Sequence, residues 1–118
     1  MVSSRSKGAS AEGQAAEYLN GLGFEILERN YSLFGNYKGG EIDIIARRDD
    51  VIHFIEVKAR NTDTFGTGRE AVRGEKPKTI RRLATHYLVK HGLWDLVAVS
   101  LDIIEITNGK IEYLENCF

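Results

Sequence analysis

Residues 41–59 read EIDIIARRDDVIHFIEVKA, and this stretch decides the fold. Two runs rich in isoleucine, valine and phenylalanine flank a polar Arg-Arg-Asp-Asp segment, a pattern that predicts a β-hairpin. The apolar positions are numerous enough to make this hairpin a core element: Ile42, Ile44, Ile45, Ile52, Phe54, Ile55 and Val57. Charged residues inside such an element therefore need a reason.

Three charged residues interrupt the apolar hairpin: Asp43 in the first run, and Glu56 and Lys58 in the second. Because side chains alternate along a strand, Glu56 and Lys58 share a face. A two-residue turn at 49–50 would set Asp43 directly opposite Glu56. A four-residue loop over 47–50 would leave the two carboxylates diagonal to each other on the same face. Either turn brings the carboxylates together.

Two neighbouring carboxylates repel each other, so a proton, the Lys58 amine or a divalent cation must relieve them. Mg²⁺ prefers oxygen ligands, and the Val57 carbonyl could supply a further one. Glu12 would be a fourth ligand, or a partner of the ligands, if the first helix packs on this face. Lys58 could orient a metal-bound water or offset negative charge on a phosphate. The alternative is a plain salt bridge of Lys58 across the strands. Glu41 reads better as a strand-entry charge than as a ligand.

The segments around the hairpin predict an α/β fold in the order αβββαββ. Apolar spacing predicts a first helix with Ser10 as its N-cap, and a second helix opened by Pro77 and ended by Gly92. We expect residues 1–8 to be disordered and residues 9–118 to form a single domain. The predicted strands cover residues 24–31, 41–46, 51–59, 95–106 and 110–114, the last pair joined by a turn at Asn108-Gly109.

Composition is that of one soluble globular domain. The chain has 118 residues, of which 42% are hydrophobic and 28% charged. No apolar run approaches the length that spans a bilayer, and the first residues lack the apolar core of a signal peptide. A lone cysteine, Cys117, cannot form an internal disulfide. These features predict a cytoplasmic protein without a membrane partner.

Charge is unevenly distributed although the net charge is only −1. Residues 58–90 hold nine lysines and arginines against three acids, whereas the segments on either side are acidic. A basic strip beside an acidic hairpin is what a cation site next to an anion-binding surface would require. The alternative reading is a solvated helix face.

Longer motifs contain these residues. They are AEGQAAEYLNGLGFEILERNY at 11–31, GGEIDIIARRDDVIHFIEVKAR at 39–60 and FGTGREAV at 65–72. In this order and spacing they resemble the YraN-like family of uncharacterised bacterial proteins. That family is in turn similar to the restriction-endonuclease-like, PD-(D/E)xK superfamily, which includes nucleases of the Holliday-junction-resolvase type.

The resemblance implies a restriction-endonuclease-like αβββαβ core, with a mixed central sheet flanked by helices and followed here by a C-terminal hairpin. It also implies an Mg²⁺-dependent nuclease site, with Mn²⁺ as a substitute. Asp43 and Glu56 match the metal-binding acids, Lys58 the catalytic lysine, and Glu12 an acidic residue on the first helix. Basic side chains then become candidate phosphate contacts: Arg60, Lys76, Lys78, Arg81 and Arg82.

The functional expectation is hydrolysis of phosphodiester bonds in DNA, including branched or repair intermediates, with DNA favoured over RNA. A homodimer is expected only by analogy with branched-DNA nucleases. Two alternatives stay open. One is a nucleic-acid-binding module of the same fold without catalysis, and the other is a structural protein in which the carboxylates only form an ion pair.

Overall fold

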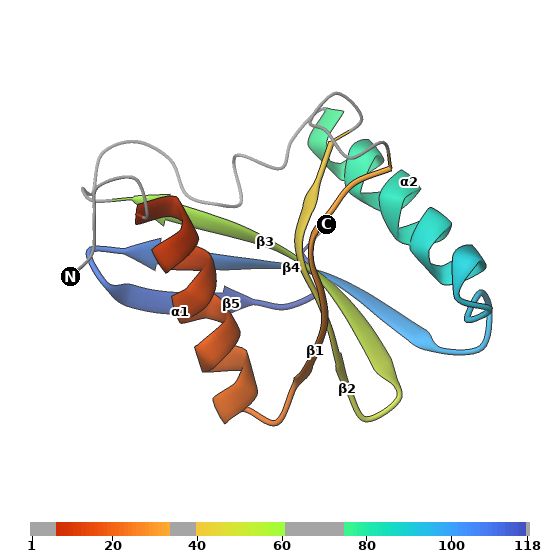
Figure 1. The fold of residues 1–118 in the computed structure, drawn as a ribbon, viewed down its shortest axis with the longest axis horizontal. Coiled ribbons are helices and arrows are strands. Elements are labelled where there is room, and N and C mark those ends of the chain that lie inside the picture. Colours follow the sequence, from red (N-terminus) through yellow and green to blue (C-terminus); the bar gives the residue numbers. More distant parts are fainter. Residues whose placement is uncertain (1–6, 34–39, 61–74, 118) are drawn as a thin grey trace.

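The computed structural model describes residues 7–33, 40–60 and 75–117, with the backbone alone described for 7–10 and 75–77. It has a five-stranded sheet in the order β1-β2-β3-β4-β5 (Figure 1). Strands β3 and β4 are parallel, and the other neighbours are antiparallel. The elements are α1 (Lys7–Gly21), β1 (Glu25–Tyr31), β2 (Ile42–Arg48), β3 (Val51–Arg60), α2 (Glu75–Lys90), β4 (Ala98–Thr107) and β5 (Lys110–Leu114). The predicted α/β class, with a mixed sheet and a C-terminal hairpin, is confirmed.

The β2–β3 hairpin has the shorter of the two turns that the sequence allowed. Arg48 pairs with Val51, so only Asp49 and Asp50 form the turn, and Asp49 takes a left-handed φ of 56°. Aspartate tolerates this conformation better than most residues. The described β2–β3 pairing runs to Ile44↔Ile55, which fixes the register of the predicted site.

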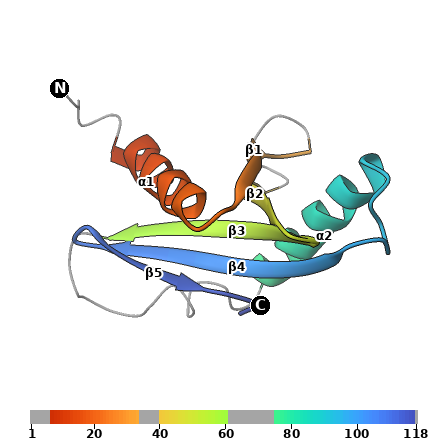
Figure 2. The ribbon, with the colours of Figure 1, turned by 90° about the horizontal axis from the view of Figure 1, so that it is seen from below.

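The two helices cover opposite faces of the sheet and bury two separate clusters (Figure 2). Helix α2 packs Ile80, Leu83 and Tyr87 against residues such as Phe54. Helix α1 packs Ala15 and Leu19 against residues that include Ile55. Successive residues of β3 thus enter different clusters, as strand alternation requires.

Three predicted boundaries need correction. Helix α1 begins at Lys7, so Ser10 lies inside the helix and is not its N-cap. The apolar spacing that predicted this helix starts at Ala11. It does not show how far the helix extends before that residue. Helix α2 begins at Glu75, so Pro77 sits within the first turn, where an amide proton has no helical partner to lose. Strand β4 begins at Ala98 rather than at residue 95.

Part of the sequence-based reading lies outside the described residues. This applies to the disorder predicted for residues 1–6 and to the FGTGREAV motif at 65–72. Lys7 and Gly8, also predicted to be disordered, belong to α1. Neither α1 nor α2 is long and apolar enough to cross a membrane.

Gly40 joins the entry to β2 with the first turns of α2. Its φ is 89°, and a Cβ added there would overlap the Cγ2 methyl of Thr79. We expect Gly40→Ala to lower the free energy of unfolding by about 2–4 kcal/mol, from backbone strain and from the overlap. Urea unfolding measures this. Adding Thr79→Ser should recover only the steric part, and an unchanged stability of Gly40→Ala would contradict the packing described.

Candidate metal and nucleic-acid site

The site lies where β2 and β3 diverge. Beyond the pair Ile44↔Ile55, residues 56–60 of β3 pair with β4. Asp43 stands at this fork, and its Oδ2 accepts a hydrogen bond of 2.8 Å from the Val57 backbone N–H. The contact holds the Asp43 carboxylate against β3, beside Glu56. A ligand role for the Val57 carbonyl stays a prediction.

Three carboxylates meet beside this fork. One oxygen each from Glu12, Glu41 and Asp43 lies within 4.8 Å of the others. They come from α1, from the residue before β2 and from β2 itself. The structure thus brings Glu12 to Asp43 as the sequence suggested. It also adds Glu41, which sequence reasoning favoured as a simple strand-entry charge.

Glu56 and Lys58 form a second part of the site. The Lys58 Nζ lies 3.5 Å from the Glu56 Oε2, and the Glu56 side chain is only 6% exposed. Glu56 does not belong to the three-carboxylate cluster, although sequence reasoning paired it with Asp43 as a ligand. The two carboxylates nevertheless interact, because the charge of Glu56 is a main reason for the raised pKa of Asp43.

The pKa of Asp43 is raised by burial and by the negative charges around it. Burial and the charge of Glu56 raise its pKa from 3.8 to about 7. Glu12 and Glu41 raise the pKa further, while the hydrogen bond from Val57 lowers it. Carboxylates so arranged offer hard oxygen atoms and excess negative charge, which is the donor set that Mg²⁺ or Mn²⁺ takes in proteins.

Asn30 is a functional candidate that sequence reasoning missed. Its Nδ2 lies 3.1 and 3.0 Å from the two Glu12 oxygens and 2.6 Å from Glu41 Oε2. Its φ of 56° is left-handed, a conformation for which asparagine is enriched. The neighbouring pairs Arg29↔Ile44 and Tyr31↔Ile42 place Asn30 across from Asp43. One amide thus links two carboxylates of the cluster.

Replacing Asn30 with aspartate should destabilise the protein by about 1–2 kcal/mol at pH 8, because a donor becomes a fourth carboxylate. The loss should shrink at pH 5, below the raised pKa of Asp43, because Asp43 is then protonated and the repulsion is smaller. Urea unfolding at both pH values tests this, with Asn20→Asp on the exposed side of α1 as the matched control. Equal effects of the two substitutions at pH 8 would contradict the linking role of Asn30.

Helix α2 carries basic residues in the half that packs near the site. Lys78, Arg81 and Arg82 are exposed on this helix. Its first turns reach the site at Thr79, which lies against Gly40, next to Glu41 in the chain. Arg60, at the end of β3, is half-buried. Lys76 lies in the first turn of α2, and its side chain is outside the described part of the structure.

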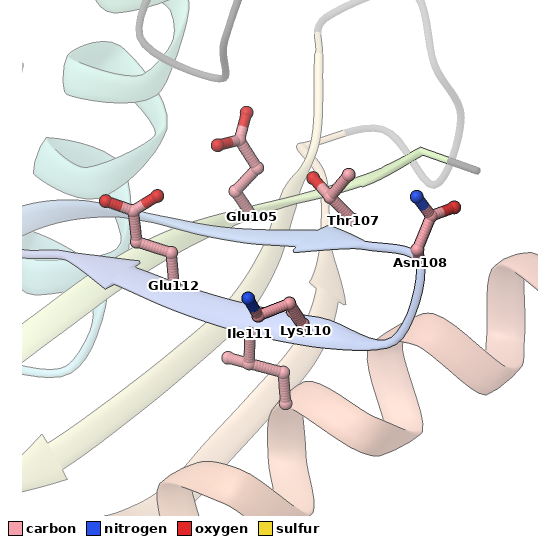
Figure 3. A pocket seen from close by; sticks show the side chains of 6 residues that line it. All are labelled: Glu105, Thr107, Asn108, Lys110, Ile111 and Glu112. Carbon is pink, nitrogen blue, oxygen red and sulfur yellow. The ribbon is translucent and has the colours of Figure 1, made fainter. Parts of the chain in front are cut away.

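The sheet face that carries Lys58 continues across β4 and β5. Lys58 pairs with Glu105, which pairs in turn with Glu112. A pocket of about 380 Å³ lies here, and Figure 3 shows Glu105, Thr107 and Glu112 pointing to one side while Ile111 points to the other, toward α1. Its lining mixes both signs of charge, so this face does not extend the basic surface of α2.

The fold and the site together define a class: an α/β protein with a five-stranded mixed sheet, two flanking helices and an acidic cluster at a fork between strands. This architecture is compatible with a restriction-endonuclease-like core. The chain belongs to the uncharacterised protein family UPF0102, whose sequence model matches residues 11–106. That range includes Glu12, Asn30 and Lys58.

Relatives match over nearly the whole chain. The chain is 42% identical to a UPF0102 protein of Moorella thermoacetica, over 97% of this chain and 96% of the relative. It is also 42% identical to a UPF0102 protein of Helicobacter hepaticus, over 98% and 96% respectively. A UPF0102 protein of Alkaliphilus oremlandii is 40% identical, over 94% and 96%.

Proposed function

We propose that this protein hydrolyses phosphodiester bonds in nucleic acid with the help of a divalent cation, and that DNA is its substrate. The observation that carries the proposal is the convergence of Glu12, Glu41 and Asp43 beside the Glu56–Lys58 pair. Repulsion among such neighbouring acids weakens the fold, and a bound cation would relieve it. A lysine next to them supplies the positive charge that phosphate chemistry needs.

The carboxylates of Glu12, Glu41 and Asp43 would hold the cation, with Mg²⁺ as the physiological ion and Mn²⁺ as a substitute. A bound ion of this kind acidifies water and neutralises charge on the phosphate. The donor set is oxygen alone, in keeping with a hard ion. Glu56 would join on the β3 side of Asp43.

Lys58 acts on the phosphate and on water. Its ammonium group can donate hydrogen bonds to a non-bridging phosphate oxygen, where negative charge grows in the transition state. In the structure this group lies 3.5 Å from Glu56, which keeps it at the fork. Glu56 can also accept a proton from the attacking water.

Basic residues hold the polyanion against this acidic site. Contacts to phosphates are made by Lys and Arg side chains without reading sequence. Lys78, Arg81 and Arg82 are exposed in the first half of α2, whose Thr79 lies against Gly40, and we assign Lys76 and Arg60 to the same surface. The proposal includes a cytoplasmic location and a homodimer, the latter by analogy with branched-DNA nucleases; light scattering tests the dimer.

Reversing two charges on α2 tests this surface. Lys78→Glu with Arg81→Glu should weaken DNA binding more than tenfold at low salt and reduce the salt slope by about 2. Fluorescence anisotropy with a labelled duplex across a salt series measures both quantities. Lys90→Glu, at the far end of α2, is the matched control. Equal salt slopes for the double variant and the wild type would place the DNA elsewhere.

A second candidate function rests on the Lys58–Glu56 contact. If this ion pair is permanent, the Lys58 amine cannot bind the phosphate. The protein would then be a nucleic-acid-binding module without catalytic activity. Both candidates predict DNA binding by α2. They differ in whether Mg²⁺ produces cleavage.

The deciding experiment is a panel of linear, nicked, flapped and branched DNA, with RNA counterparts, incubated with Mg²⁺, Mn²⁺ or EDTA. The nuclease proposal predicts cleavage of at least one DNA substrate with either cation and none with EDTA. Binding across the panel with no cation-dependent cleavage would favour the binding module. RNA cut in preference to DNA would overturn the substrate assignment.

A further inference from the structure

A second cluster of metal-ligating side chains lies nearer the β2–β3 turn, at the end of β3 away from the fork. His53 of β3, Asp102 of β4 and Glu115 after β5 each place one ligand atom within 4.8 Å of the others. His53 and Asp102 are buried, whereas Glu115 is half exposed. His53 and Glu56 are three residues apart on one strand, so they point to opposite faces. His53 also precedes Val57 by four residues, about 13 Å along β3, so this cluster is separate from the proposed nuclease site.

Three donors hold the Asp102 carboxylate, and the His53 imidazole lies against it. Ser100 Oγ, at 2.5 Å, and the Asn116 backbone N–H, at 2.9 Å, both reach Oδ1. The Tyr113 hydroxyl donates to Oδ2 at 2.5 Å, and His53 Nδ1 lies 2.6 Å from the same oxygen. Such outer partners orient carboxylate ligands in metal sites.

The distances are near those of a tetrahedral ion. With metal–ligand bonds of about 2.0–2.1 Å, two ligand atoms lie roughly 3.3 Å apart. His53 Nδ1 is 2.6 Å from Asp102 Oδ2 and 4.0 Å from Glu115 Oε2. To bind one ion, the His53–Asp102 distance would have to increase and the His53–Glu115 distance would have to decrease, each by less than about 1 Å. His53 would then carry its proton on Nε2, leaving the Nδ1 lone pair for the ion.

The cluster can be reached from solvent. A pocket of about 440 Å³ is lined by His53, Ser100, Glu115 and Asn116, together with Arg48. Glu115 Oε2 lies 3.9 Å from Arg48 Nη2, and both side chains are at least a third exposed. An ion pair this long and exposed contributes little, so Glu115 is able to turn inward.

We propose that His53, Asp102 and Glu115 form a binding site for a divalent transition metal of the Zn²⁺ class, completed by water from the pocket. An imidazole with two carboxylates suits Zn²⁺, whereas Mg²⁺ favours oxygen donors alone. The ion would bridge β3, β4 and the segment after β5. The site would thus tie the C-terminal segment to the sheet.

Calorimetric titration with ZnCl₂ tests the site, in an Asp43→Asn background that disables the acidic cluster. One ion per chain should bind, and millimolar Mg²⁺ should not displace it. Adding Glu115→Gln should weaken binding by about tenfold or more, because a charged ligand is lost while the fold keeps its buried groups. Glu112→Gln, on the opposite side of β5, should leave binding unchanged.

Nitrogen NMR of the imidazoles identifies the ligand. On addition of Zn²⁺, the Nδ1 signal of His53 should shift and return with a chelator. No stoichiometric Zn²⁺ binding, or equal affinity with and without Glu115→Gln, would overturn the proposal. A shift confined to the exposed His86 and His91 would do so as well, because it would mark adventitious surface binding.

Discussion

Lys58→Met is expected to lower Mg²⁺-dependent DNA cleavage by about 10²–10³-fold while leaving DNA affinity within a few-fold. Methionine keeps the length of the side chain and removes only its charge. The ammonium group stands 3.5 Å from Glu56, at the fork where Asp43 reaches β3. Cleavage rates on the best substrate of the panel, beside anisotropy measurements of binding, separate the two effects.

Lys110→Met is the matched control, because Lys110 is an exposed cation on β5 of the same sheet. It should cleave at the wild-type rate. If Lys58→Met cleaved as fast as this control, Lys58 would have no catalytic role, and any activity would have to come from other groups. Weakened binding in Lys58→Met alone would assign the residue to the DNA surface.

Asp43→Asn should have two opposite effects. It should abolish cleavage, because Asp43 loses the negative charge that would bind the cation. Asp43 belongs to the carboxylate cluster and also interacts with Glu56. It should also stabilise the metal-free protein at pH 8 by an amount on the order of 2 kcal/mol. Asparagine keeps an oxygen that accepts the Val57 N–H and removes the repulsion from neighbouring carboxylates.

The pH dependence follows from the raised pKa of Asp43, about 7 against 3.8. The folded protein binds this proton more tightly than the unfolded chain does. Its contribution to stability is therefore complete below pH 3.8 and is lost as the pH rises through 7. Urea unfolding between pH 5 and 8 should show a fall in wild-type stability that Asp43→Asn reduces. Asp50→Asn, in the exposed hairpin turn, should show the same change of stability with pH as the wild type. If Asp43→Asn also showed the wild-type change, the negative charge around Asp43 would not be what lowers stability.

The hairpin shows how far sequence reasoning reached. Two apolar runs around a polar segment predicted β2 and β3, and a two-residue turn was one of two options that kept Asp43 and Glu56 on one face. The structure selects that turn. Asn108-Gly109, with φ values of 51° and 83°, forms the predicted turn between β4 and β5. Local turn chemistry and strand period are enough for these features.

The rest of the acidic cluster depends on tertiary geometry. Strand β1 changes register between Ile26 and Glu28, and Asn30 then turns left-handed. Only this path carries the Asn30 amide to Glu12 and Glu41. The spacing of residues in a single sequence does not show that β1 brings Asn30 to Glu12 and Glu41. The sequence did not predict the His53–Asp102 pair either, because the two residues are 49 positions apart in the chain.

Manganese titration followed by NMR tests the central claim, that the acidic cluster holds a divalent cation. Mn²⁺ is paramagnetic and broadens signals of nearby nuclei. At substoichiometric Mn²⁺, the backbone amides of Asn30, Asp43 and Val57 should broaden first, and excess Mg²⁺ should restore them. Uniform broadening over the surface, or none below millimolar Mn²⁺ in the presence of DNA, would contradict the account.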